Sequence, residues 1–411
     1  MSCAVFLWGQ SAKDKSVASL AEPLNNPSVD LHVFYVHGMG INPPDFKNPQ
    51  DFETSQEFRK SFCKRVHCTN DQRLNRYYAT EGSFDPNKSG PDLFYLGHKT
   101  WATPDDWRAA APFVVNYRVD RGHGNPIYLH EINWWPLILS AKCRQIIAHE
   151  AALVGRDDKH TAVCSAKTVQ DGDKRFTSYA WLHDDGIDKP DPSWPTSPPL
   201  NRFLKHDILD WGFADAVLAV GPLRPCLLEG IRELILHSYT PAANQEFVIV
   251  SHSLGSYLMF SALDQLSEDK CSVGSNRNDN RPAGGFDDVL GKTSHAYFMA
   301  NQVSLLELAN LDNSRDGALI AHLKRWRDLR LAAGKHPPKI VAWSDPGDLL
   351  TWKVPDLVDE HEKVVRVENR PAKNARRWPW LWLLVNPYNA HLGYDKNNQV
   401  VQAMIPKHAL Q

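Results

Sequence analysis

Ser253 is the residue whose type and surroundings most clearly suggest chemistry. It lies at the centre of Ser251-His252-Ser253-Leu254-Gly255, between the wholly apolar run 247–250 and a strongly helical run, 254–266. Short apolar runs of this kind indicate buried strands. A strand that turns sharply into a helix needs small residues two positions before and after the turn, and Ser251 and Gly255 are both small. The turn would present the Ser253 hydroxyl at the helix N-terminus, where the Leu254 amide can stabilise a negative oxygen.

Chance is the alternative explanation, because a pentapeptide with two small positions recurs in unrelated proteins. The strand before Ser253 and the helix after it favour a nucleophile over chance.

A second strand-like run, 31–36, ends at His37-Gly38-Met39-Gly40. Glycine lets the backbone of this loop approach a bound substrate closely. A plain turn between a strand and a helix would explain the same residues.

Acid and base candidates follow later in the chain. Asp345 and Asp348 come directly after the run 339–343, and His391 lies in the loop sequence 386–394. A serine nucleophile needs an imidazole to take its proton and a carboxylate to orient that imidazole. Asp345 precedes Pro346, so it could instead cap the local turn through its side chain.

The chain has 18 His, and four others compete with His391 for the role of base. His252 lies inside the turn and is expected to point away from Ser253, and His361 sits in the charged run 359–363, which is typical of a solvated face. His37 and His295 complete the list of competitors.

The elements that must position these residues alternate along the chain. Strands are expected at 31–36, 113–119, 127–135, 247–250, 296–300, 339–343 and 364–367. Helices are expected at 55–66, 137–154, 206–220, 223–238, 254–266 and 319–331. This alternation predicts an α/β fold with a mostly parallel sheet and helices on both faces. Such sheets bind ligands at the carboxyl ends of their strands, where most of the candidate residues fall.

Together, these motifs resemble the α/β-hydrolase superfamily, and more closely its lipase-like serine esterases. The resemblance consists of landmarks scattered over residues 31–394, in the order Ser253, Asp348, His391, and Ser251 departs from the family's usual first glycine. It implies an acyl-enzyme on Ser253, His391 as base and acid, and an oxyanion hole from the Met39 and Leu254 amides. The Gly347-Asp348-Leu349-Leu350-Thr351 sequence resembles the acid loop of lipases and favours Asp348 over Asp345. No cofactor or metal is expected.

The expected domain organisation follows from this resemblance. Residues 1–30 form an N-terminal segment, and residues 31–411 form one hydrolase domain with insertions around 41–110, 155–240 and 270–292. Ser253 lies 216 positions after His37, which is farther than a compact hydrolase needs, so part of the chain between them is expected to form a cap.

The composition of the chain excludes some classes of binding partner and indicates a compartment. With 46 Lys+Arg and 48 Asp+Glu, the net charge of −2 argues against a nucleic-acid binder, which needs a basic surplus. No apolar run is long enough for a transmembrane helix, and the N-terminus lacks the basic residues and core length of a signal peptide. Seven scattered Cys show no disulfide framework and favour a reducing compartment. We therefore expect a soluble, cytoplasmic protein, with export or peripheral membrane contact left open.

The substrate is less constrained by the residues. The segment 373–385 combines Lys373, Arg376 and Arg377 with three Trp and several Leu, which suits contact with a lipid surface. Packing of its apolar part beneath the His391 loop is the simpler alternative. We expect a lipid-like carboxylic ester; the alternatives are a small soluble ester or thioester, and a catalytically silent module that binds lipid or protein.

Two other chemistries find little support. Cys63, His67 and Cys68 lack a second ligand pair at zinc spacing. No glycine-rich phosphate-binding motif follows a strand, so nucleotide binding is not expected.

Overall fold

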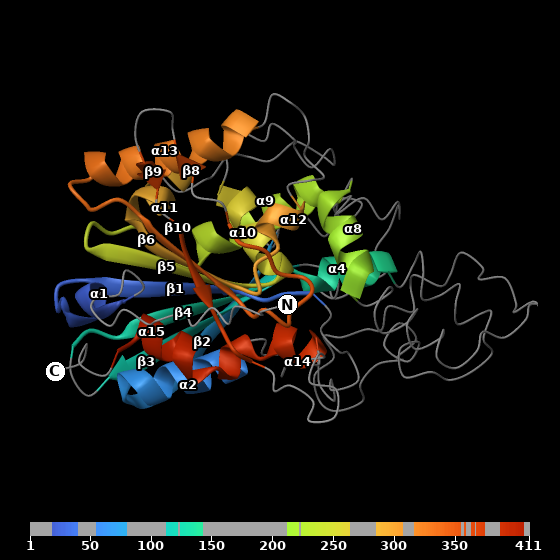
Figure 1. Ribbon diagram of the computed structural model, residues 1–411. Coiled ribbons are helices and arrows are strands. Elements are labelled where there is room, and N and C mark those ends of the chain that lie inside the picture. Colours follow the sequence, from blue (N-terminus) through green and yellow to red (C-terminus); the bar gives the residue numbers. More distant parts are fainter. Residues whose placement is uncertain are drawn as a thin grey trace, which may run out of the picture.

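The computed structural model (Figure 1) describes residues 19–39, 55–79, 112–121, 124–142, 212–221, 223–263, 285–306, 316–354, 357–358, 363–365, 367–374 and 387–406. Several residues discussed above lie outside these ranges, namely Gly40, His361, most of the 155–240 stretch and residues 375–386.

An eight-stranded sheet forms the centre of the molecule, in the order β10-β7-β6-β5-β1-β4-β3-β2. The strands from β10 to β4 all pair in parallel, while β3 is antiparallel to both of its neighbours. Two short strands, β8 and β9, form a separate antiparallel pair. The strands are β1 (Asp30–Val36), β2 (Cys68–Tyr78), β3 (Phe113–Arg121), β4 (Ile127–Asn133), β5 (Gln245–His252), β6 (Thr293–Met299), β7 (Lys339–Ser344), β8 (Leu357–Val358), β9 (Lys363–Val365) and β10 (Val367–Pro371).

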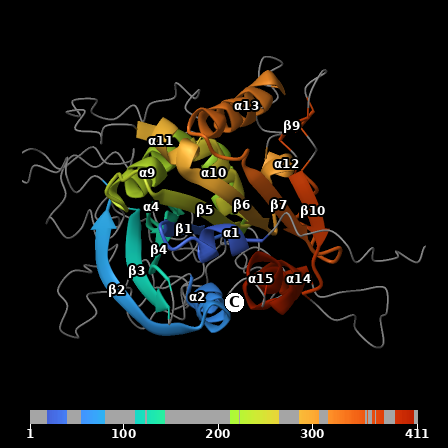
Figure 2. The ribbon, with the colours of Figure 1, turned by 90° about the vertical axis from the view of Figure 1, so that its left-hand side faces the viewer.

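Helices cover both faces of this sheet. Figure 2 shows α9, α10, α11 and α13 on one side and α1, α2, α14 and α15 on the other. Among the described residues, no helix is both long and apolar enough to cross a membrane. The helices are α1 (Ala21–Asn25), α2 (Gln56–Val66), α4 (Trp135–Lys142), α8 (Ala214–Val220), α9 (Arg224–His237), α10 (Leu254–Leu263), α11 (Gly285–Lys292), α12 (Val303–Leu306), α13 (Asp316–Ala332), α14 (Pro387–Leu392), the 3₁₀ helix η9 (Tyr394–Lys396) and α15 (Asn398–Met404).

The two faces of β1 show how the core is divided. Phe34 and Val36 belong to the cluster packed beneath α9 and α10, whereas Val33 and Tyr35 belong to the cluster packed against α2 and α15. Successive residues of a strand point to opposite faces, so a strand covered on both sides must be apolar throughout. The predicted α/β fold with a mostly parallel sheet and helices on both faces is therefore confirmed.

Three stretches differ from the sequence-based expectation. β2 lies within 41–110, expected to be an insertion, and is the polar edge strand of the main sheet. α9 lies within 155–240, also expected to be an insertion, but contributes core residues, and the helix α11 forms within the third expected insertion, 270–292. The predicted strand 364–367 corresponds to the end of β9 and the start of β10. Polarity misled the prediction, because β2 is held by pairing with β3 and not by a buried face, whereas α11 needs only one buried stripe.

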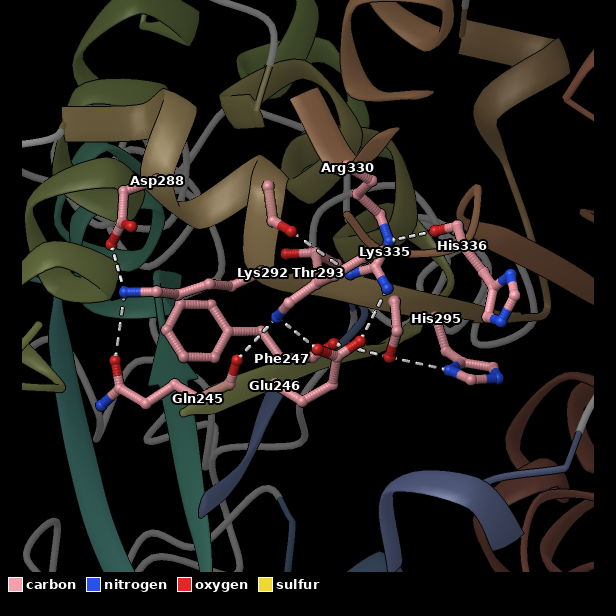
Figure 3. A network of polar contacts seen from close by, with 12 residues as sticks. Gln245, Glu246, Phe247, Asp288, Lys292, Thr293, His295, Arg330, Lys335 and His336 are labelled. Carbon is pink, nitrogen blue, oxygen red and sulfur yellow. Dashed lines mark hydrogen bonds and ion pairs between the residues drawn. The ribbon is translucent and has the colours of Figure 1, made fainter. Parts of the chain in front are cut away.

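A network of charged side chains joins α11 and α13 to the amino ends of β5 and β6 (Figure 3). Glu246 accepts hydrogen bonds from Arg330 Nη2 at 2.8 Å and Lys335 Nζ at 2.6 Å. Lys292 Nζ lies 2.7 Å from Asp288 Oδ2 and 3.3 Å from Gln245 Oε1. These bonds fix the helices to the amino ends of the strands, whereas Ser253 lies at the carboxyl end of β5. We therefore assign this network to stabilising the fold.

A disulfide joins Cys63, in the last turn of α2, to Cys68, the first residue of β2. Cys226 is also disulfide-bonded. The expectation that no disulfide would form is therefore wrong for these residues, and the thiols of the Cys63/Cys68 cluster are not available as metal ligands. Disulfides persist mainly in oxidising compartments, so they remove the basis for expecting a reducing one.

Candidate active site

Ser253 occupies a strained turn between β5 and α10. Its φ angle is +53°, in the left-handed region that residues other than glycine rarely adopt. The Ser253 amide donates to the Met299 carbonyl at 2.7 Å, and the Ser253 carbonyl accepts from the Ser256 amide at 3.0 Å. These bonds tie the turn to the end of β6 and to the first turn of α10. Backbone strain of this kind persists only where the surrounding structure enforces it, and it is common at functional sites.

The small residues around the turn are required by close backbone contacts. A Cβ at Gly255 would lie 2.6 Å from the Val36 carbonyl oxygen and still closer to the His37 carbonyl oxygen. Real Cβ atoms essentially never make contacts this short. A Cβ at Gly38 would lie 2.7 Å from Cβ of Ser253. Ser251 is buried and its hydroxyl donates to Ser256 Oγ at 3.2 Å, so serine is accommodated at this position.

His391, from α14, lies beside the Ser253 hydroxyl. Its Nε2 atom is 2.8 Å from Ser253 Oγ, although the two residues are 138 positions apart in the chain. Its Nδ1 atom is 2.9 Å from each carboxylate oxygen of Asp348. A carboxylate accepts only, so Nδ1 carries the proton and Nε2 is free to accept the serine proton. Ser253, Asp348 and His391 are 0%, 6% and 8% exposed, so water competes little with these bonds.

The structure places Asp348, and not Asp345, against His391. Asp348 lies in the loop after β7, where its Oδ1 also accepts from the Leu350 amide at 2.9 Å. Asp345 accepts from the Gly347 amide at 2.7 Å and the Asn374 amide at 2.5 Å. Asp345 therefore stabilises the turn, which is the alternative that the sequence left open.

Tyr394 connects these two acidic residues. Its hydroxyl accepts from the Asp345 amide at 2.5 Å and lies 3.4 Å from Asp348 Oδ2. Burial first, and then the charge of Asp348, raise the pKa of Tyr394, so the hydroxyl stays protonated. The sequence offered only its position three residues after His391 as a signal.

Met39 and Leu254 lie on the two backbone segments that meet at Ser253. Leu254 is the first residue of α10, and amides of a first helical turn have no acceptor within the helix. Met39 follows Gly38, which is in close contact with Ser253. Both amides are thus in the segments where an oxyanion hole would form.

Trp134 holds the loop after β1, a role that sequence reasoning missed. Its Nε1 donates to the His37 carbonyl at 3.0 Å, and its ring stacks on His37 with centroids 4.8 Å apart. His37 Nδ1 is 2.7 Å from the Gly38 carbonyl, and burial lowers the pKa of His37 to about 3. His37 is therefore neutral and part of the loop framework.

His252 and His295, the other described competitors, are not within bonding distance of Ser253 Oγ. His252 Nε2 bonds to the carbonyl of His391 at 3.0 Å, and His295 Nδ1 bonds to Ser294 Oγ at 2.9 Å. Burial is the main cause that lowers the pKa of each to about 3.

The chain matches no protein-family model, no curated protein and no solved structure. Its function can therefore be inferred only from the chemistry of this site.

Proposed function

We propose that this chain is a serine hydrolase of the α/β-hydrolase type that cleaves carboxylic esters. One observation carries the proposal, namely the continuous hydrogen-bonded path from Ser253 Oγ through His391 to Asp348, at 2.8 and 2.9 Å. Ser253 and Asp348 follow the carboxyl ends of the parallel strands β5 and β7, and His391 lies on α14, in the chain order typical of this fold. A satisfied core network has no need of a strained serine at its centre.

The proposed reaction proceeds through an acyl-enzyme. Ser253 Oγ attacks the ester carbonyl while His391 Nε2 takes its proton, and the Met39 and Leu254 amides stabilise the oxyanion. The intermediate collapses, and His391 returns the proton to the departing alcohol. Water then attacks the acyl-enzyme by the same steps and releases the acid. Asp348 keeps His391 in the required tautomer and stabilises the imidazolium.

Exposed apolar side chains beside the acid and the base favour an apolar acyl group. Leu349, next to Asp348, is 71% exposed, and Leu392, next to His391, is 39% exposed. Trp352 is 42% exposed, and its backbone is bonded to Asn301, in the loop after β6. The apolar surface of these side chains is exposed to water, and a lipid-like acyl chain could bury it. Of the segment 373–385, which first suggested a lipid, only Lys373 and Asn374 are described.

Labelling by a fluorophosphonate probe tests the proposed chemistry. We expect the wild-type chain to be labelled and Ser253→Ala to lose all labelling, because Ser253 is the only proposed nucleophile. Mass spectrometry of the labelled peptide should place the adduct on Ser253. If the folded wild-type protein is never labelled, the proposal of a serine hydrolase is refuted. The alternative of a catalytically silent binding module then remains.

Chain-length preference tests the lipid-like substrate. We expect Leu349→Asp to lower kcat/KM about 10-fold for a long-chain ester, since losing contact with one or two methylenes costs about 1–2 kcal/mol. A short-chain ester should be affected less than twofold. Leu331→Asp is the matched control, because Leu331 is 50% exposed on α13. Equal losses for both esters would favour the small soluble substrate.

A further inference from the structure

His252 is the last residue of β5 and precedes Ser253 directly, yet its side chain contacts the opposite end of the chain. Its Nε2 atom lies 3.0 Å from the backbone carbonyl oxygen of His391, 139 residues away. A carbonyl only accepts hydrogen bonds, so His252 Nε2 is the donor. This bond joins the segment that carries the serine to the helix that carries the imidazole.

We propose that His252 is a positioning residue, whose hydrogen bond to the His391 carbonyl holds the His391 imidazole at bonding distance from Ser253. The inference rests on the proposed function, and it identifies a residue that affects the rate of the proposed ester hydrolysis. Proton transfer in such a pair depends steeply on geometry, and a displacement of about 1 Å can cost roughly 100-fold in rate.

The surroundings of His252 leave its ring little freedom. The residue is 6% exposed, and its ring centroid lies 5.5 Å from that of His391 and 5.9 Å from that of Tyr394. On its other side, a Cβ at Gly38 would lie 2.8 Å from His252 Nδ1. The imidazole is thus packed between the loop that carries Met39 and the segment that carries His391.

The charge state of His252 is consistent with this role. Burial, and then the proximity of His391, lower the pKa of His252 to about 3. A neutral ring donates to the carbonyl without placing a positive charge beside His391. Such a charge would oppose the imidazolium that His391 must form during the reaction.

Three substitutions separate positioning from simple packing. His252→Phe keeps a ring but removes the N–H donor, His252→Gln keeps a donor at similar reach, and His252→Asn keeps an amide that is too short. We expect Phe to lower kcat about 10- to 100-fold with KM changed less than threefold. Gln should restore kcat to within about threefold of wild type. Loss of packing alone would not be rescued by Gln.

The controls keep the outcomes distinguishable. If the Phe variant fails to fold, the comparison of Gln with Asn decides, and we expect Gln to be at least about 10-fold faster. Wild-type kcat in the Phe variant, or equal kcat in Gln and Asn, would overturn the role of His252 while leaving the hydrolase intact. A wild-type chain without fluorophosphonate labelling would overturn both proposals.

Discussion

Asp348→Asn is expected to lower kcat about 10,000-fold while leaving the protein folded. Both carboxylate oxygens of Asp348 now face the Nδ1 proton of His391 at 2.9 Å. An asparagine amide can turn an N–H towards Nδ1, which favours the tautomer with the proton on Nε2. That tautomer cannot accept the proton of Ser253. Turnover of a chromogenic ester, with circular dichroism of the same sample, measures the effect.

Asp345→Asn is the matched control, because it makes the same chemical change three residues away. Asp345 accepts from two backbone amides and does not bond to His391. Asparagine keeps one acceptor, so we expect the free energy of unfolding to fall by about 1–2 kcal/mol and kcat to fall less than 10-fold. A larger loss of kcat in Asp345→Asn than in Asp348→Asn would reverse the assignment of the acid.

Acid is expected to remove most of the free energy of unfolding between pH 6.5 and pH 4. Burial lowers the pKa of five histidines, to about 3 for His32, His37, His252 and His295 and well below the usual value for His130. Below pH 6.5 the unfolded chain binds protons that the folded chain does not, so stability is full above this pH and falls as pH drops towards 3. At pH 5 each such histidine costs about 2 kcal/mol, while Asp395, whose pKa burial raises to about 6, returns about 1 kcal/mol. The net loss is still a large part of the stability of a typical domain.

Burial is the main cause of the low pKa of His32 and His130, and the row of hydrogen bonds that holds their rings agrees with two neutral imidazoles. Lys292 donates to Gln245 at 3.3 Å, and Gln245 Nε2 lies 3.4 Å from His32 Nε2. His32 Nδ1 lies 2.8 Å from His130 Nε2, and His130 Nδ1 lies 2.7 Å from Asn116 Oδ1. In this order each group donates to the next, and a second proton on His130 would point at the His32 donor. Figure 3 shows the Lys292 and Gln245 end of this row.

Urea denaturation at pH 7.5, 6.0 and 5.0 measures the acid effect. His295→Gln should reduce the slope of unfolding free energy against pH by about one proton, because it removes one buried imidazole. Burial is the main cause of the low pKa of His295, so glutamine, which does not titrate, removes this contribution. Equal unfolding free energies at pH 7.5 and 5.0 would contradict the prediction.

The sequence predicted the buried strands and the segments around the candidate site well, because their signals are local. The runs at β1, β5 and β7 are apolar, and each ends within a few residues of a group with recognisable chemistry. The choice between Asp345 and Asp348 needed coordinates, since both follow the same strand.

Other features could not be read from the sequence because they depend on contacts between distant segments. Nothing local marks Trp134 as a donor to His37, or His252 as a donor to His391. β2 escaped prediction because its polar sequence lacks the alternation of a half-buried strand. It is held by pairing with β3 on one side only.

The polar character of the sheet's borders has a consequence for self-association. From Thr69 to Asn75, β2 is exposed and carries Asp71 and Arg73, and at the opposite border of the described sheet β10 has a Glu368–Arg370 ion pair and ends at Pro371. Charges and proline at unpaired strands discourage a second chain from adding its own strand there. We therefore expect the two borders of the described sheet to resist the strand-by-strand addition that builds ordered aggregates.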